Sequence, residues 1–418
     1  RREDMKGGRI IVVGGGAAGL IAAGQAAEAG AESLLLEKMT QPGRKLSITG
    51  KGRCNITNIA EITDFLGHFG REGRFLRHAF SRFFSGELMG FLEGLGLNMV
   101  TERGGRVFPA TGHAPDVVAV LLQWLKRCGV NIQSSSAVER LVLKNGRVTG
   151  VVSHGREFPS DAAILATGGA SYPATGSTGD GYLLAASAGH TIVPVRPALV
   201  PLETAGNPAA RMAELRLRNI KVAMIVNDRK AREAFGELEF ADFGVTGPVV
   251  LTLSGEAVDA MGAGKRVVFS IDLKPALDEK KLDARLLRDF ASRGKEEISS
   301  VLRGLLPGRR VPVCLDLTKI LPDRLASQVS AKERTRLRRW LKDFRLEITG
   351  HRPFSEAIVT AGGVDTREVD HRTMESRLTK GLFIAGELLN VHGDTGGYNL
   401  QAAFSTGWLA GLSAASGS

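Results

Sequence analysis

The stretch from Arg9 to Glu37 has the sequence RIIVVGGGAAGLIAAGQAAEAGAESLLLE, and it decides the fold of the amino-terminal part of the chain. An apolar, β-branched run ends at Val13, where a glycine cluster begins. Residues 20–29 are rich in alanine and predict a helix, and residues 31–36 form a second apolar run. Strand, turn, helix and strand within about 30 residues are the layout of a βαβ nucleotide-binding unit.

The glycine cluster matches the dinucleotide-binding pattern Gly14-x-Gly16-x-x-Gly19. In this pattern the first glycine permits a tight turn, the second lets the backbone approach a pyrophosphate, and the third lets the helix pack on the sheet. The helix N-terminus offers free N–H groups to the phosphates. Glu37 ends the second strand, where its carboxylate can accept hydrogen bonds from adenosine ribose hydroxyls. The acidic residue favours an unphosphorylated ribose, as in FAD or NAD.

Residues 43–58, GRKLSITGKGRCNITN, follow that strand directly and are polar, glycine-rich and basic. Arg44, Lys45 and Arg53 could neutralise a pyrophosphate or hold a flavin ring, and Asn55 could bind the edge of the ring. A solvated loop is the alternative, but the apolar residues within the segment indicate partial burial. Cys54 fits a small core residue better than a point of flavin attachment.

Two further glycine motifs follow apolar strands. Gly168 and Gly169 come after the run 162–166, and Gly386 comes after a strand near the carboxyl terminus. A helix is predicted after Gly396-Gly397, and its N-terminus could stabilise the negative charge that a flavin pyrimidine ring gains on reduction. The alternative in each case is that the glycines only make turns.

The middle of the chain has a different pattern. Residues 116–128 predict an amphipathic helix, and residues 138–153 predict a hairpin that turns at Asn145-Gly146. From about 195 to 272 the chain has short β-branched runs, at 221–226, 249–253 and 267–271, which predict strands. Residues 278–341 are helical in pattern, and residues 345–349 and 357–360 return to strand.

We therefore expect an α/β fold in which a discontinuous FAD-binding domain is interrupted by a β-rich insert and a helical subdomain. Residues 1–4, before the first methionine, are left out of this prediction. The expected domains are an FAD-binding domain over 5–194 and 361–418, a β-rich substrate or cap domain over 195–273 and 343–360, and a basic helical subdomain over 274–342.

Composition narrows the class of protein. Apolar residues make up 43% and charged residues 24% of 418 residues, as in folded globular proteins. No apolar run is long enough to span a membrane, and three distant cysteines exclude a disulfide framework, so we expect a cytoplasmic protein. No metal site is predicted.

Most of the net charge of +11 comes from the predicted helical subdomain, which contains 18 basic and 9 acidic residues. A solvated helical surface explains this pattern, and a platform for nucleic acid or another anionic partner is the sharper interpretation. Only Phe290 and Trp340 are aromatic there, so no surface for stacking bases is indicated.

Five long motifs resemble one known family: GGGAAG, GRKLSITGKGRCNITN, ATGGASYPATGSTGDGY, EAIVTAGGV and GELLNVHGDTGGYNLQAAFSTG. They are similar, in this order and over nearly the whole chain, to the BaiN-like or YhiN-like NAD(P)/FAD-dependent oxidoreductases. The resemblance implies a glutathione-reductase-type FAD domain interrupted by a β-barrel and a helical subdomain. Two positions depart from the expected pattern, Lys51 in place of glycine and Asn390 in place of aspartate.

Motif and resemblance together give one candidate FAD-binding set. The resemblance implies that the following residues line FAD: Gly14, Gly16, Gly19, Glu37, Arg44, Arg53, Asn55, Thr167, Gly168, Gly386, Gly397 and Asn399. Their neighbours complete the set: Ala18, Lys38, Lys45, Cys54, Val138, Gly169, Glu387, Gly396 and Leu400.

The chain holds one strand-positioned dinucleotide motif, so a resident NAD(P) domain is not expected and NAD(P)H would be a transient co-substrate. We predict hydride transfer between flavin N5 and a small organic substrate, such as reduction of an activated C=C bond. Thr178-Gly179-Asp180-Gly181 resembles flavoprotein subunits of the succinate dehydrogenase type, which supports C–C chemistry. The alternatives are an amine oxidase that uses O2, a nucleic-acid-associated flavoprotein of the tRNA-modifying type, and a non-catalytic flavin-binding module.

The candidate catalytic residues are Tyr172, His351 and Arg352. Tyr172 follows a glycine pair, and the other two lead back towards the FAD domain. Each also has a structural explanation, as a packed ring, a turn residue and a surface ion pair respectively.

Overall fold

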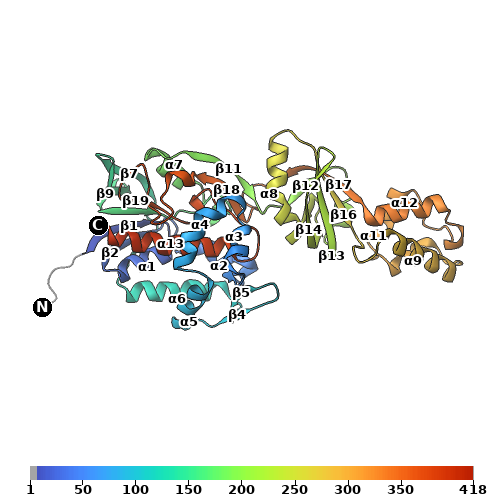
Figure 1. Cartoon of the computed structure of the whole chain (residues 1–418), viewed down its shortest axis with the longest axis horizontal. Coiled ribbons are helices and arrows are strands. Elements are labelled where there is room, and N and C mark those ends of the chain that lie inside the picture. Colours follow the sequence, from blue (N-terminus) through green and yellow to red (C-terminus); the bar gives the residue numbers. More distant parts are fainter. Residues whose placement is uncertain (1–6, 418) are drawn as a thin grey trace. The chain divides into compact units, whose positions relative to one another are not determined.

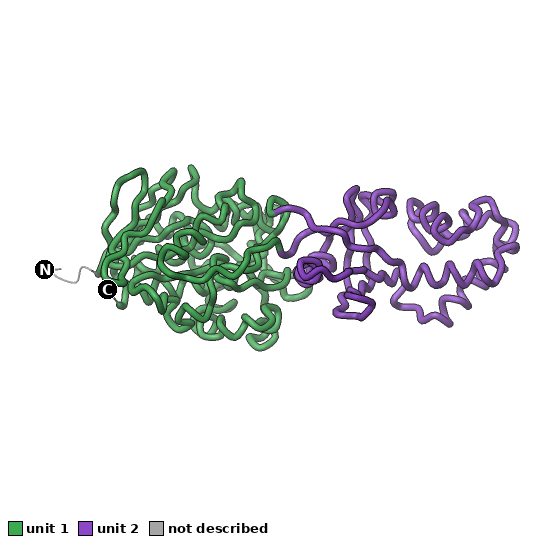
Figure 2. The backbone as a smooth tube through the Cα atoms, turned by 90° about the horizontal axis from the view of Figure 1, so that it is seen from above, with its two compact units in different colours: residues 1–197, 354–418 green, residues 198–353 purple. Residues whose placement is uncertain are grey.

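The computed structural model describes residues 7–417, so residues 1–4 lie outside it. The chain forms two compact units (Figure 2). Unit 1 comprises the described residues up to 197 together with 354–417, and unit 2 comprises 198–353.

Unit 1 is built on a five-stranded parallel sheet (Figure 1). The residues at the carboxyl ends of the central strands pair with one another, Val13 with Leu36 and with Leu165. These strands are almost completely buried, as expected for a parallel sheet covered on both faces. In spatial order the strands are β19 (Leu382–Ile384), β10 (Ala162–Leu165), β1 (Gly7–Val13), β2 (Ala31–Leu36) and β6 (Asn131–Gln133).

Two helices pack closely on this sheet, α1 (Ala17–Glu28) and α13 (Tyr398–Ser416). A Cβ atom on Gly407 would lie 2.3 Å from the Ala18 carbonyl oxygen, and one on Gly411 would lie 2.4 Å from that of Ala22. The second contact lies four residues after the first in both helices, so the two helices run parallel. The N-terminus of α13 extends about 13 Å beyond Gly407, at 1.5 Å per residue, past the start of α1.

The remaining elements of unit 1 surround this core. The hairpin of β7 (Val138–Lys144) and β8 (Arg147–Ser153) turns at Asn145-Gly146, whose φ angles of 50° and 73° confirm the predicted turn. The other helices are α2 (Arg44–Gly52), α3 (Ile62–Gly67), α4 (Gly73–Arg82), α5 (Ser85–Gly94), α6 (Ala114–Arg127) and α7 (Asp180–Ser187). The other strands are β3 (Thr57–Asn58), β4 (Met99–Thr101), β5 (Arg106–Pro109), β9 (Arg156–Pro159), β11 (Ile192–Ala198) and β18 (Val359–Val364).

Unit 2 contains a closed six-stranded barrel. Residues 249–253 were predicted as a strand and instead belong to helix α8 (Pro248–Gly262). Pro248 stands at the first helical position, and the buried residues Val250, Leu253 and Ala257 follow helical spacing, which outweighs the β-branched composition. The barrel strands are β12 (Leu202–Thr204), β15 (Gly244–Thr246), β14 (Arg229–Phe240), β13 (Arg216–Val226), β16 (Val267–Asp272) and β17 (Phe344–His351).

A helical region is inserted between β16 and β17. It consists of α9 (Glu279–Ser292), α10 (Ile298–Val301), α11 (Arg310–Thr318) and α12 (Ala331–Lys342). The predicted α/β class with a barrel insert and a helical region is confirmed. Across residues 7–417, no helix has the length and apolar character needed to cross a membrane.

Candidate active site

In the turn after β1, Gly14 and Gly19 have the steric roles predicted from the sequence, and the pyrophosphate-binding role of Gly16 stays a prediction. Gly14 has a φ of +99°, and a Cβ atom there would lie 2.6 Å from the Ala166 carbonyl oxygen. A Cβ atom on Gly19 would lie 1.8 Å from the Gly14 carbonyl oxygen, so only glycine lets α1 approach the turn. At Gly16 a Cβ atom would meet open space. Gly16 is also the N-cap of α1 and provides no side chain for the first N–H groups, which leaves them available to an anion.

Glu37 stands beside this turn and is 9% exposed. Its Oε2 accepts a hydrogen bond from the Gly15 N–H at 2.7 Å, and its Oε1 accepts one from the Met39 N–H at 2.7 Å. Each carboxylate oxygen retains a lone pair for a further donor. Val138 begins β7 close by, because the Ser136 N–H donates to the Glu37 carbonyl oxygen. This arrangement fits the ribose hydroxyls of an adenosine.

Two basic side chains that were predicted to bind the cofactor, Lys38 and Arg53, form hydrogen bonds with other side chains of unit 1. The Lys38 Nζ donates to Thr178 Oγ1 at 2.6 Å and to Asp180 Oδ2 at 2.9 Å, so it holds the Thr-Gly-Asp-Gly turn. The Arg53 guanidinium donates to Glu102 Oε1 at 2.5 Å, which lowers the pKa of that carboxyl group. Roles of Lys38 and Arg53 at the cofactor therefore remain predictions.

The segment 43–58 forms a kinked helix followed by a turn. Arg44 begins α2 and is exposed, and the helix is interrupted at residues 49–51. Lys51 has a φ of 57°, which explains why glycine is expected there. Cys54 is completely buried, and burial raises the pKa of its thiol to about 12. The neighbouring Asn55 Oδ1 is buried and has no hydrogen-bond partner among the described residues, which suits a donor on a bound ring.

A polar network joins four separate segments of unit 1. The Lys45 Nζ donates to Glu387 Oε2 and to Ser171 Oγ, both at 2.7 Å. The Glu387 Oε1 accepts from the Ser171 hydroxyl at 3.1 Å and from the Thr360 N–H at 2.8 Å. Lys45 and Glu387 were predicted, whereas Ser171 and Thr360 were not. Both missed residues lie inside the quoted motifs ATGGASYPATGSTGDGY and EAIVTAGGV, and that was the available signal.

The network closes around the glycine pair that follows β10. A Cβ atom on Gly169 would lie 2.5 Å from Thr360 Oγ1, and one on Gly168 would lie 3.1 Å from Ser177 Oγ. Thr167 Oγ1 is buried and lacks a partner within the described part of the chain. Gly386 lies against the start of helix α1, because a Cβ atom on Gly386 would be 2.8 Å from the Cβ atom of Ala18.

The N-terminus of α13 contacts the segment after α2. Gly397 has a φ of +99°, and a Cβ atom there would lie 2.4 Å from the Thr57 carbonyl oxygen, so the backbone contact itself requires glycine. The Gly396 carbonyl oxygen accepts from Asn58 Nδ2 at 3.2 Å. The Asn399 carboxamide accepts from the Gly393 N–H at 2.8 Å and donates to two loop carbonyls, which fixes the loop ahead of Leu400 in the first turn.

A second cluster at this helix end was missed by sequence reasoning. The Asp394 Oδ2 lies 3.0 Å from His68 Nδ1, and the imidazole stacks on Tyr398 with ring centroids 3.9 Å apart. Asp394 and Tyr398 belong to the last quoted motif, but nothing in the sequence marks His68. The cluster stabilises the loop that precedes α13.

The predicted catalytic residues divide between the units. Tyr172 lies in unit 1 with a φ of 53°, a conformation that is costly for an aromatic residue. In unit 2, the Arg352 guanidinium donates to Glu203 Oε1 at 3.1 Å and lies 4.6 Å from the centroid of Phe243. The His351 Nδ1 donates to the Arg352 carbonyl oxygen at 2.9 Å. The structure does not bring the three together within one unit.

Most of the other candidate cofactor-binding residues gather at the carboxyl edge of the unit 1 sheet. The buried Glu37 carboxylate fits the adenosine of FAD, and the open turn at Gly16 fits the pyrophosphate. The unpartnered Asn55 oxygen and the N-terminus of α13 fit the flavin ring. Within residues 7–417, no group of three or more histidine, cysteine or acidic side chains could hold a metal ion.

Comparison with known proteins gives matches over nearly the whole chain. The HI0933-like protein Rossmann domain family matches residues 8–413. The 3-dehydro-bile acid delta(4,6)-reductase of Clostridium scindens is 36% identical over 410 residues, 97% of this chain and 99% of that protein. The ribosomal RNA dihydrouridine synthase of Escherichia coli is 28% identical over 398 residues, 95% of this chain and 96% of that protein.

Among solved structures, 3-ketosteroid-Δ4-(5α)-dehydrogenase from Rhodococcus jostii RHA1 has a TM-score of 0.53 at 15% identity. The match covers 99% of this chain and 98% of that one. A flavocytochrome c3 fumarate reductase has a TM-score of 0.51 at 18% identity and covers 98% of this chain and 78% of that one. These two likenesses show a common fold.

Proposed function

Because this chain belongs to the HI0933-like family and is an FAD-dependent oxidoreductase, we propose that it reduces a C=C bond conjugated to a carbonyl group in a small organic substrate. The observation that carries the proposal is the 36% identity with a Δ4,6-reductase over 97% of the chain. The names of both curated relatives describe addition of hydrogen across a C=C bond. NAD(P)H is the proposed electron donor, acting transiently at the flavin.

The residues of unit 1 would hold the parts of FAD separately. Glu37 would accept the ribose hydroxyls, and the open N-terminus of α1 at Gly16 would bind the pyrophosphate. Asn55 and the first turn of α13 would surround the ring. Once bound and reduced by NAD(P)H, FAD would supply the hydride that adds to the electron-poor carbon of the substrate.

The chain must then supply a proton to the neighbouring carbon and donors to the carbonyl oxygen. Tyr172 is our candidate for the proton donor, because its strained backbone follows the network of Lys45, Ser171 and Glu387. Arg352 is a candidate for binding the carbonyl oxygen through its guanidinium N–H groups, and His351 is a candidate for the same role through its imidazole. The His351 Nδ1 already donates to the Arg352 carbonyl oxygen, so Nε2 is the ring nitrogen left for the substrate.

A second candidate substrate is a uracil base in RNA, which also contains a C=C bond conjugated to a carbonyl group. The observation that favours it is the basic surface of α9 and α12. Lys280, Arg288, Lys332 and Arg339 are exposed there and form no ion pair with any described residue. By contrast, Arg334 and Arg338 of α12 pair with Asp283.

The test uses purified, FAD-loaded protein with NADH or NADPH under anaerobic conditions. The acceptors are a 3-keto-4-ene steroid, an α,β-unsaturated acid and a uridine-containing ribosomal RNA transcript, with product mass as the readout. Saturation of the steroid or the acid supports the main proposal, and dihydrouridine in the transcript supports the second. Reduction of the oxidised flavin by amines, with no alkene consumed, would contradict both and favour an amine oxidase.

A further inference from the structure

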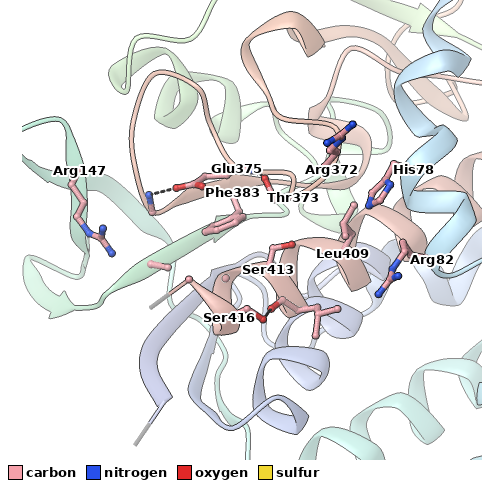
Figure 3. Close-up of a pocket in the computed structure, with 15 residues that line it drawn as sticks. His78, Arg82, Arg147, Arg372, Thr373, Glu375, Phe383, Leu409, Ser413 and Ser416 are labelled. Carbon is pink, nitrogen blue, oxygen red and sulfur yellow. Dashed lines mark hydrogen bonds between the residues drawn. The ribbon is translucent and has the colours of Figure 1, made fainter.

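A pocket of about 460 Å³ lies at the amino-terminal edge of the unit 1 sheet (Figure 3). Ala162, which begins β10, and Gly381, which precedes β19, line it. The candidate FAD residues follow the carboxyl ends of the same strands. Because a strand rises about 3.3 Å per residue, the length of β10 alone separates the two edges by about 13 Å. The pocket is therefore distinct from the FAD site.

Most of the ionisable side chains in the lining are basic. Arg82, Arg372 and His78 gather at one end of the pocket, on the side of α4, and Arg147 lies towards the other end (Figure 3). None of these arginines forms an ion pair with a carboxylate in the described part of the chain. Glu375 is the acidic residue of the lining, and its Oε1 already accepts from the Gly381 N–H at 2.9 Å.

The surroundings of His78 confirm that cations are crowded at this end. Burial and the positive charges of Arg82, His371 and Arg372 lower the pKa of His78, and Asp370 opposes them only in part. The C-terminus of α13, at Ser416 and Gly417, adds the negative end of a helix dipole, which is worth less than a full charge. An anion would relieve the remaining repulsion.

Between the two basic ends, Phe383 and Leu409 provide an apolar wall. A volume of this size holds a small molecule. Two guanidinium groups and an imidazole at one end present more donors than a single carboxylate accepts, and they match the several oxygens of a phosphate. We propose that this pocket binds a small organic phosphate, with the phosphate at Arg82, Arg372 and His78 and the carbon skeleton against Phe383 and Leu409.

The test is calorimetric titration of the FAD-loaded, full-length protein with inorganic phosphate, ribose 5-phosphate and AMP at constant ionic strength. We expect one site that binds at least one organic phosphate more tightly than inorganic phosphate. The double variant Arg82→Gln, Arg372→Gln should weaken binding at least tenfold. Arg77→Gln is the matched control, because Arg77 lies on the same helix, is exposed and does not line the pocket.

FAD content and the melting temperature of each variant check that the fold is intact. Equal binding by the double variant and the wild type would overturn the proposal, as would the absence of any binding. Binding of a short RNA that is lost in the double variant, without binding of the small phosphates, would also overturn it and assign the surface to nucleic acid.

Discussion

The two edges of the parallel sheet in unit 1 are built from different kinds of group. At the carboxyl edge the geometry is set by backbone, since Gly14 and Gly19 are required by contacts that any Cβ atom would break. At the amino edge the pocket is lined by long cationic side chains, Arg82 and Arg372 among them. A backbone-built site leaves a motif in the sequence, whereas a site built from scattered side chains does not.

The largest effect should come from replacing Gly19 with alanine. The added Cβ atom would lie 1.8 Å from the Gly14 carbonyl oxygen, so α1 must move away from the turn. We expect a loss of about 3 kcal/mol in the free energy of unfolding and no retained FAD. Thermal melting and flavin content measure both quantities.

Gly16→Ala is the matched control, because its Cβ atom would meet open space. It should melt close to the wild type and bind FAD more weakly, since a pyrophosphate would approach that position. If Gly19→Ala retained wild-type stability and FAD, the steric account of the carboxyl edge would be wrong.

Tyr172→Phe should have the next largest effect, on rate alone. Removing a general acid lowers the rate by about 10²- to 10⁴-fold. Rapid-mixing kinetics should show slow reoxidation of the reduced flavin by the alkene and unchanged reduction by NAD(P)H. Equal slowing of the two half-reactions would indicate that Tyr172 only supports the fold.

Glu37→Ala should weaken FAD binding by about 1.5 to 3 kcal/mol, the value of hydrogen bonds to a charged group. The substitution also removes the acceptor of the Gly15 and Met39 N–H groups, so a lower melting temperature of the FAD-free protein is expected as well. Titration with FAD separates the two effects. Unchanged FAD affinity would mean that the ribose binds elsewhere.

The smallest expected effect is the pH dependence of stability that comes from Cys54. It tests how completely the segment beside the carboxyl edge of the sheet is buried. Burial raises the pKa of Cys54 from 9.0 to about 12, so the thiol stays protonated in the folded protein. Its titration leaves stability unchanged below about pH 9, and stability falls as pH rises from 9 towards 12, because only the unfolded state ionises there.

Alkylation below pH 9, followed by peptide mass analysis, checks this directly. Cys128 is only partly buried and should be labelled in the native protein, whereas Cys54 should be labelled only after unfolding. Rapid labelling of Cys54 in the native, FAD-loaded protein would contradict the packing described for this segment.

The predictable parts of the molecule are those decided by local physics. The turn at Asn145-Gly146 and the turn at Gly14 need positive φ angles that few other residues accept, so the sequence marks them. Helix α8 was missed because its β-branched run is compatible with a strand until the proline at its start is weighed. The contact of Gly397 with Thr57 is tertiary, and its backbone requirement could not be foreseen.

Side-chain partners in the site were harder to foresee than the site itself. Lys38 and Arg53, which are predicted at the cofactor, form ion pairs with Asp180 and Glu102 that the sequence did not indicate. Which basic side chains form ion pairs within the protein depends on which carboxylates the tertiary structure brings close to them. His68 had no signal at all, because its partners Asp394 and Tyr398 lie at the opposite end of the chain.

The most direct test of the proposed reaction is a single turnover without oxygen. FAD-loaded protein is reduced chemically, freed of reductant and mixed with one equivalent of a conjugated cyclic enone, and both flavin absorbance and product mass are followed. We predict return of the oxidised flavin spectrum with an equal amount of saturated ketone. Flavin that stays reduced with the enone, with the unsaturated acid and with uridine-containing RNA would contradict it.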